Sequence, residues 1–188
     1  MTLRLASSTV LVALFSLAGT AVLAEEPPKK IDAKDIKVEI KDAELTLNGQ
    51  KVTLPCDTES VEKVFGKPSR SVYLGNTALV WDDVGISAYQ DRDSKKIISL
   101  SFALRESNAV QAPEKTFQGK VLVDGSNVTA DTKVPELVGT KKGKPFVQSD
   151  IVEQLWSIKH DGGVKVSLSA ANKKGDGIAL VEYSFSKR

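Results

Sequence analysis

Few residues in this chain are of the types that carry out enzymatic chemistry. His160 is the single histidine and Cys56 the single cysteine. A catalytic cysteine needs a basic partner, and a zinc site with one histidine would need carboxylates for most of its other ligands. No Gly-x-Ser-x-Gly segment is present to predict a hydrolase nucleophile. A Ser-His-Asp triad using His160 stays open, because its members can be far apart in the sequence.

Acidic and glycine-rich segments do not complete a catalytic or metal-binding motif either. Asp82 and Asp83 are adjacent, and neighbouring side chains on a strand point to opposite faces, so they are not expected to share a site. The segment 91–95 begins like a calcium loop, but Lys95 occupies a ligand position and no downstream Gly and Glu complete it. Residues 139–143 lack the spacing of a phosphate-binding loop. We therefore expect no enzyme, no metal and no cofactor.

The most distinctive pattern is Gly-Lys-Pro-Ser-Arg at 66–70 followed by Trp-Asp-Asp-Val-Gly-Ile at 81–86. One interpretation is structural, with a helix end, a Trp on a sheet and a tight turn. The other is a partner-binding patch, because Arg and aromatic residues dominate binding hot spots. That patch would contain Arg70, Tyr73, Trp81 and Tyr89, with Asp82, Asp83, Asp91 and Asp93 at its rim.

The first 24 residues predict a secretory signal peptide. Arg4 precedes an apolar run over 10–23, and small residues lead to a cleavage site after Ala24. The run is too short, and too rich in Ser, Thr and Gly, for a transmembrane helix. No cysteine follows it, so a lipoprotein anchor is not expected. We expect a periplasmic or secreted protein with a flexible charged leader at 25–35.

Charge and cysteine content narrow the class of partner. The chain has 26 Lys and Arg against 24 Asp and Glu, a net charge of +2 at pH 7. Such a balance argues against binding to nucleic acid or to an anionic membrane surface. Because Cys56 stands alone, no disulfide can form within the chain, and stability must come from a packed core.

The first half of the chain reads as a hairpin, a helix and a series of strands. Asn48-Gly49 between two alternating apolar runs predicts a type I′ hairpin. A short helix is predicted next, with Asp57 or Thr58 as its cap, Val61, Val64 and Phe65 on one face, and Gly66 at its end. Strands are predicted at 71–74, 78–81, 86–90 and 97–104, and the short links between them indicate an antiparallel meander.

The second half repeats this order, with a hairpin at 119–130, a helix at 134–138 and strands at 151–158, 164–170 and 178–185. The segment 151–158 also fits a helical face behind Ser149 or Asp150. The sequence therefore predicts an α+β fold, mostly antiparallel sheet with two short helices. Two tandem hairpin-helix-meander units, at 36–110 and 111–188, would pack as one globule.

With the residues of 61–70 and 81–86 in view, the chain resembles small exported bacterial proteins of unknown function that carry G-x-P-S-R followed by W-D-x-x-G-I. It is also similar to outer-membrane assembly lipoproteins of the SmpA/BamE type and to β-lactamase-inhibitor proteins built from two helix-plus-sheet units. These resemblances imply an architecture used to bind other proteins.

These observations lead to three functional hypotheses. The first is a non-enzymatic periplasmic module that binds another envelope protein, as an immunity protein or an enzyme inhibitor does. The alternative is a carrier that holds a small apolar ligand or lipid between sheet and helices. The third is a hydrolase that uses His160. Fold alone distinguishes none of these.

Overall fold

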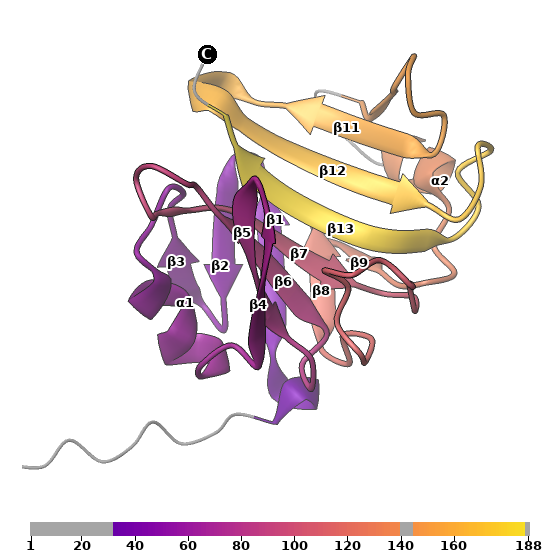
Figure 1. Ribbon diagram of the computed structural model, residues 1–188. Helices are drawn as coiled ribbons and strands as arrows, with labels where there is room; N and C mark the ends of the chain where they lie inside the picture. The colour runs from indigo at the N-terminus through magenta and orange to yellow at the C-terminus, as the bar shows by residue number, and fades with distance from the viewer. Residues whose placement is uncertain (1–31, 140–144, 187–188) are drawn as a thin grey trace, which may run out of the picture.

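The computed structural model describes residues 32–139 and 145–186, which form two facing β-sheets (Figure 1). The five-stranded sheet has the order β3-β2-β1-β8-β9 and the eight-stranded sheet the order β10-β11-β12-β13-β7-β6-β5-β4. Every pair of neighbouring strands is antiparallel except β1 and β8, which run parallel. The predicted antiparallel sheet is therefore confirmed.

The bounds of the elements are as follows. The five-stranded sheet contains β1 (Lys37–Lys41), β2 (Glu44–Leu47), β3 (Gln50–Val52), β8 (Lys120–Val123) and β9 (Ser126–Val128). The eight-stranded sheet contains β4 (Arg70–Leu74), β5 (Asn76–Trp81), β6 (Ile86–Gln90), β7 (Ile97–Ala103), β10 (Val147–Gln148), β11 (Leu155–Lys159), β12 (Val164–Ala170) and β13 (Ile178–Phe185). The helices are η1 (Ala33–Asp35), α1 (Thr58–Phe65), α2 (Val134–Gly139) and η2 (Asp161–Gly163).

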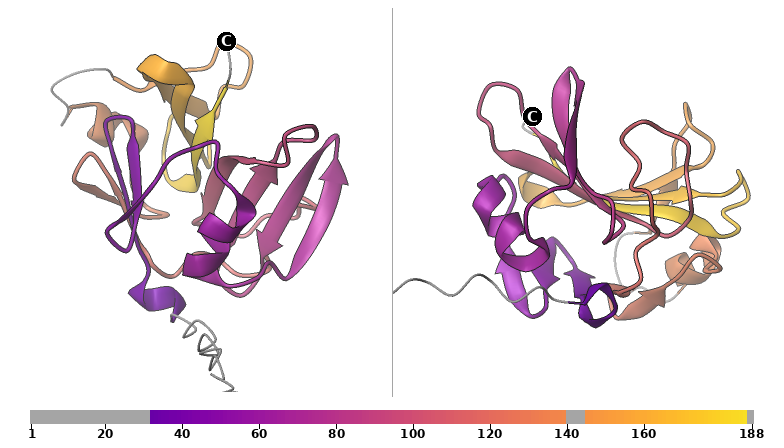
Figure 2. Two further views of the ribbon diagram at one scale, coloured as in Figure 1. Left: turned by 90° about the vertical axis from the view of Figure 1, so that its left-hand side faces the viewer. Right: turned by 60° about the horizontal axis from the view of Figure 1, so that its bottom comes forward.

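The α+β class predicted from the sequence is wrong, because the two layers of the molecule are both sheets. The helices α1, of eight residues, and α2, of six, lie at opposite ends of the molecule instead of forming a layer (Figure 2). Alternating apolar residues dominate the chain, and this pattern forms strands that bury one face. The fold is predominantly β.

The order of hairpin, helix and four antiparallel strands occurs in both halves of the chain, as β2–β7 and as β8–β13. Both sheets nevertheless draw strands from both halves. In the five-stranded sheet β1 pairs with β8, and in the eight-stranded sheet β7 pairs with β13. The long-range β7–β13 register places Phe102 opposite Val181 and Leu100 opposite Tyr183.

Turn chemistry explains where the hairpins form. Asn48 and Gly49 have φ values of 50° and 80°, and Asp124 and Gly125 have values of 47° and 83°. Asn, Asp and Gly tolerate this left-handed region better than other residues, which is why they are found in type I′ turns. The predicted hairpin at Asn48-Gly49 is confirmed.

The helix α1 seals one end of the core. Val61, Val64 and Phe65 are buried, as their spacing predicts, and Phe65 packs edge-to-face on Trp81 with ring centroids 6.2 Å apart. Asp57 is the residue before the helix, but its carboxylate makes no capping hydrogen bond and accepts one from Lys96 at 2.6 Å instead.

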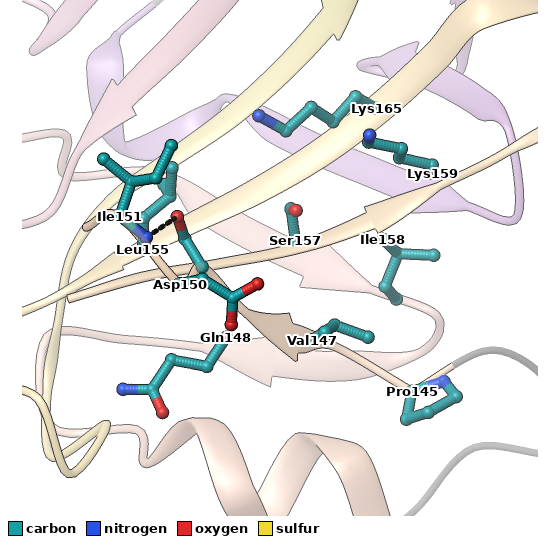
Figure 3. A pocket seen from close by; sticks show the side chains of 11 residues that line it. Pro145, Val147, Gln148, Asp150, Ile151, Leu155, Ser157, Ile158, Lys159 and Lys165 are labelled. Atoms are coloured by element: carbon teal, nitrogen blue, oxygen red, sulfur yellow. Dashed lines mark hydrogen bonds between the residues drawn. The ribbon is translucent and has the colours of Figure 1, made fainter. Parts of the chain in front are cut away.

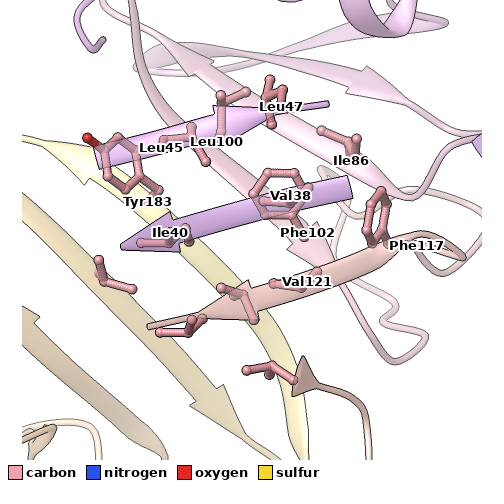
Figure 4. Packing of buried hydrophobic residues seen from close by; sticks show 14 of the residues in the cluster. Val38, Ile40, Leu45, Leu47, Ile86, Leu100, Phe102, Phe117, Val121 and Tyr183 are labelled. Atoms are coloured by element: carbon pink, nitrogen blue, oxygen red, sulfur yellow. The ribbon is translucent and has the colours of Figure 1, made fainter. Parts of the chain in front are cut away.

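The core fills the space between the sheets (Figure 4). Both sheets contribute buried side chains that alternate along their strands, among them Val38, Ile40, Leu45, Leu47, Ile86, Leu100 and Phe102. The one polar group that Figure 4 labels, the Tyr183 hydroxyl, donates a hydrogen bond to the carbonyl of Ala43 at 2.7 Å. Buried polar groups are normally satisfied in this way.

The ambiguous segment 151–158 is neither one strand nor a helix. Residues 149–154 form a loop, and the strand β11 begins at Leu155. Within the described residues, no helix is long and apolar enough to cross a membrane.

Candidate functional site

Trp81, one of the residues predicted for a partner-binding patch, lies in the core. Its side chain is 1% exposed, and its indole Nε1 donates a hydrogen bond to the carbonyl of Gly66 at 2.7 Å. Of the two interpretations, the structural one holds for Trp81, because its buried ring is not available to a partner.

Arg70 and Asp82 bind each other on the outer face of the eight-stranded sheet, the face that points away from the five-stranded sheet. Arg70 Nε donates to Asp82 Oδ2 at 3.0 Å, and Nη2 donates to Oδ1 at 3.1 Å. The same guanidinium donates to the carbonyls of Val110 at 2.8 Å and Ala112 at 2.7 Å. Asp82 is buried rather than at a rim, and both groups are occupied by the chain itself.

The partner of this pair is the β7–β8 loop, residues 104–119. The Asp82 carboxylate accepts a hydrogen bond from the backbone N–H of Glu114 at 3.1 Å. The Asp82 carbonyl accepts one from the backbone N–H of Lys115, also at 3.1 Å. Asp83 pairs with Lys115 Nζ at 2.7 Å. Phe117 N–H then donates to the Ala103 carbonyl at 2.7 Å, and the loop re-enters the core.

Gly85 allows the loop to pass closely. Its φ is +81°, and a Cβ added there would lie 2.2 Å from the backbone nitrogen of Phe117. Ser69 also contributes, because its hydroxyl accepts a hydrogen bond from the Asp82 N–H at 3.1 Å. The two sequence motifs thus form one clamp, made of Ser69, Arg70, Asp82 and Gly85, that holds the β7–β8 loop against the sheet.

The remaining patch residues are spread over the molecule. Tyr89 lies beneath the β7–β8 loop, where it lines a hollow together with Gln111. Burial is the main cause that raises the pKa of Tyr89, followed by the charge of Glu182. Tyr73 is 65% exposed near the end of β4, away from this loop. Asp91 binds Ser94 within a turn. The structure brings Arg70, Asp82, Asp83 and Tyr89 together around one loop, and leaves Tyr73, Asp91 and Asp93 outside it.

A second site was missed by the sequence reasoning. Three aliphatic side chains near β10 are strongly exposed: Ile151 by 93%, Val147 by 63% and Val152 by 49%. Val147 and Ile151 line a cleft of about 640 Å³, the β10–β11 cleft, whose walls also include Leu155, Ile158, Lys159 and Lys165 (Figure 3). One feature of the sequence could have indicated this site. Ile151 and Val152 lie between Ser149-Asp150 and Glu153, where a surface loop is expected to be polar.

Hydrogen bonds fix the loop that presents Ile151. The Ser149 hydroxyl accepts from the N–H groups of Ile151 at 3.2 Å and Val152 at 3.1 Å. The Ser149 N–H donates to the Leu155 carbonyl, and the Leu155 N–H donates to the Val152 carbonyl, each at 2.8 Å. The apolar side chain is therefore held outward by an ordered backbone, as such serine turns do.

The cleft is basic on its inner wall. Lys159 and Lys165 are directly opposite each other across β11 and β12. Like charges in this position repel one another. Within residues 32–139 and 145–186, neither lysine belongs to an ion pair, and Asp150 is the single carboxylate among the residues that line the cleft.

Residue types that can bind a metal ion do not form a metal centre in the described part of the chain. In the described part of the chain, no three His, Cys, Asp or Glu side chains lie close enough to hold a metal ion. His160 lines a small cavity of about 130 Å³ with Ser186 and Lys165. Burial, and then the charge of Asp57, raise the pKa of Cys56 to about 11, so this thiol is protonated at neutral pH.

The fold and these sites define a two-sheet, predominantly β protein with a clamped loop and a cleft on its larger sheet. The chain belongs to the family described as a domain of unknown function, DUF7738, whose model matches residues 37–137. The matched segment contains the whole clamp and ends before the β10–β11 cleft. No curated protein matches the sequence.

One solved structure is similar in outline. It is a cysteine-rich secretory protein from Staphylococcus aureus subsp. aureus Mu50, with 12% sequence identity and a TM-score of 0.45. The similarity covers 81% of this chain and 51% of that chain, so this protein spans about half the length of that structure.

Proposed function

We propose that this protein is an exported, non-enzymatic module that binds another protein of the cell envelope through the β10–β11 cleft. The observation that carries the proposal is Ile151, whose side chain is 93% exposed although its backbone is held by hydrogen bonds. Contiguous exposed apolar side chains with a polar surround are typical of interaction sites.

The chemistry of the cleft supports a specific kind of partner segment. Burying Ile151 against a partner would contribute roughly 1.5–3 kcal/mol. An ordered loop loses little conformational entropy on binding, which favours affinity. The opposed Lys159 and Lys165 would be relieved of their mutual repulsion by carboxylates. The partner is therefore a protein segment with an apolar side chain next to acidic residues.

Export and the type of partner are further parts of the proposal. The signal-peptide pattern, with cleavage at Ala24, lies outside the described residues and supports a periplasmic or secreted location. The resemblance to SmpA/BamE-type and β-lactamase-inhibitor proteins supports binding to a protein, as an immunity or inhibitor protein would. Arg70 and Asp82, which the sequence analysis assigned to a partner-binding patch, hold the β7–β8 loop and do not line this cleft.

Affinity capture from an envelope extract of the host tests the proposal. The wild type and Ile151→Asp are compared, with Val110→Asp as matched control, since Val110 is 60% exposed on the β7–β8 loop, elsewhere on the molecule. We expect one stoichiometric partner that the wild type and the control retain and Ile151→Asp loses. Retention by Ile151→Asp, while circular dichroism shows an intact fold, would refute the cleft as binding surface. Equal loss with Val110→Asp would do so too.

A further inference from the structure

A second hollow lies beneath the β7–β8 loop. Its volume is about 370 Å³, within the range of small-molecule sites, which begins at about 300 Å³. The floor comes from β6, β7 and β13 of the eight-stranded sheet, and the loop residues 107–113 form the roof. Small side chains, Ala103, Ala109, Ala112 and Ala179, leave the space open.

Polar groups from three strands converge on the floor. Ser87 is opposite Ser101 across β6 and β7, and Ser101 is opposite Glu182 across β7 and β13. This register places two hydroxyls and a carboxylate in one row on the outer face. Tyr89 is two residues beyond Ser87 on β6, so its side chain is on the same face. All four residues line the hollow.

Glu182 is the charge in the hollow that lacks an ion-pair partner among the described residues. In the described part of the chain, Glu182 has no cation within ion-pair distance, although it is partly buried. Arg105 is the one cation among the described residues that line the space, and it is already engaged. Its Nη2 donates to the Ala130 carbonyl at 2.8 Å and lies 3.6 Å from Asp131 Oδ1. The charge of Glu182 also reaches Tyr89, whose pKa it helps to raise.

We propose that this hollow, the Glu182 pocket, binds a small polar molecule that carries a protonated amine and hydroxyl groups. The amine lies at Glu182, and the hydroxyls bind Tyr89 and the serines of the row. A half-buried carboxylate without a counter-ion is stabilised by a ligand cation, and a hydrogen bond between charged groups contributes more than a neutral one. The clamp of Arg70 and Asp82 keeps the roof in place.

This inference is independent of the proposed protein-binding function. The residues that line the Glu182 pocket and those that line the β10–β11 cleft have no member in common. A variant at Ile151 is therefore expected to bind the small molecule as the wild type does, so failure of either proposal leaves the other standing.

Isothermal titration calorimetry with glucosamine tests the pocket, at a pH where the amine is protonated. Glucose serves as the neutral probe of the same shape. We expect glucosamine to bind the wild type at least about tenfold more tightly than glucose. Glu182→Gln should lose at least about tenfold in affinity for glucosamine, because the amide keeps the shape and removes the charge.

Control variants make the test decisive. Glu59→Gln makes the same change on the exposed surface of α1 and should leave the affinity unchanged. Tyr89→Phe should lower the affinity for glucosamine and for glucose by the same factor, since it removes a hydroxyl and no charge. No binding of glucosamine to the wild type would overturn the proposal. Equal affinity for both sugars, or undiminished affinity in Glu182→Gln, would also overturn it.

Discussion

Arg70 is the residue whose replacement most directly tests the clamp on the β7–β8 loop. Arg70→Ala removes the two-pronged contact with Asp82 and the hydrogen bonds to the carbonyls of Val110 and Ala112. It leaves Asp82, whose side chain is 12% exposed, without its counter-charge. The loop then retains the Phe117 backbone contact and the hydrogen bonds from Glu114 and Lys115 to Asp82.

The size of the effect follows from burial. Removing one partner of a fully buried ion pair costs about 3–5 kcal/mol, chiefly because the other charge stays buried alone. The Arg70 side chain is 34% exposed, so water screens part of the interaction. We therefore expect a loss of about 2–3 kcal/mol in the free energy of unfolding. With an ordinary urea dependence this lowers the unfolding midpoint by roughly 1 M or more.

Urea unfolding and amide hydrogen exchange are the measurements. In Arg70→Ala, the amides of Glu114 and Lys115 should exchange faster, because Arg70 no longer holds the Asp82 carboxylate and the carbonyls of Val110 and Ala112, and the loop opens more often. Lys115→Ala is the matched control; it removes a surface ion pair with Asp83 and should leave the midpoint close to that of the wild type. A double variant with Asp82→Asn should lose less than the sum of the single losses, since the two residues act together.

The reasoning would be refuted by a midpoint for Arg70→Ala equal to that of Lys115→Ala. It would equally be refuted by additive losses in the double variant, or by unchanged exchange at Glu114 and Lys115. In each case the loop would be held by its other contacts, and the clamp would not be the reason for the spacing of the two motifs.

Two further predictions concern the glycine in the clamp and the single thiol. Gly85→Ala should destabilise the protein by more than about 3 kcal/mol in thermal unfolding, because strain at positive φ adds to a clash with Phe117. Gly75→Ala has similar backbone strain but open space around the added methyl group, so it should cost about 1 kcal/mol. Equal losses in the two variants would contradict the close approach of the loop to Gly85. Iodoacetamide should alkylate Cys56 at pH 8 about a hundredfold more slowly than a free cysteine, since its pKa is raised to about 11. The rate should rise with pH and recover in urea, and a rate at pH 8 equal to that of free cysteine would contradict the assignment.

Local features of this protein could be predicted from the sequence because short-range physics determines them. The hairpin at Asn48-Gly49 depends on residues that tolerate positive φ, and α1 depends on the spacing of Val61, Val64 and Phe65. The antiparallel meander follows from short links between alternating strands. These features need no knowledge of distant contacts. The α+β fold class was wrong because the sequence predicted two helices but did not show that both layers of the molecule would be sheets.

The site depended on contacts between distant residues. Sequence reasoning selected Arg70, Asp82 and Tyr89 as unusual, but their partners are on a loop up to 42 residues away, and no periodicity reports such pairing. Trp81 was selected for its type, yet its indole donates to the Gly66 carbonyl inside the core. Residue type alone does not distinguish an exposed anchor from a buried one.

The sequence by itself determined the turns, the strand pattern and the scarcity of catalytic residues, all of which depend on neighbours along the chain. Only the tertiary structure decided which faces are buried. The pairing of β7 with β13 places Ser101 opposite Glu182, and the fold of residues 149–154 exposes Ile151. The β10–β11 cleft is lined by residues between 145 and 165, which are close in the sequence. The Glu182 pocket instead arises from strands and a loop that lie far apart in the sequence, where long-range packing, and not local preference, sets the geometry.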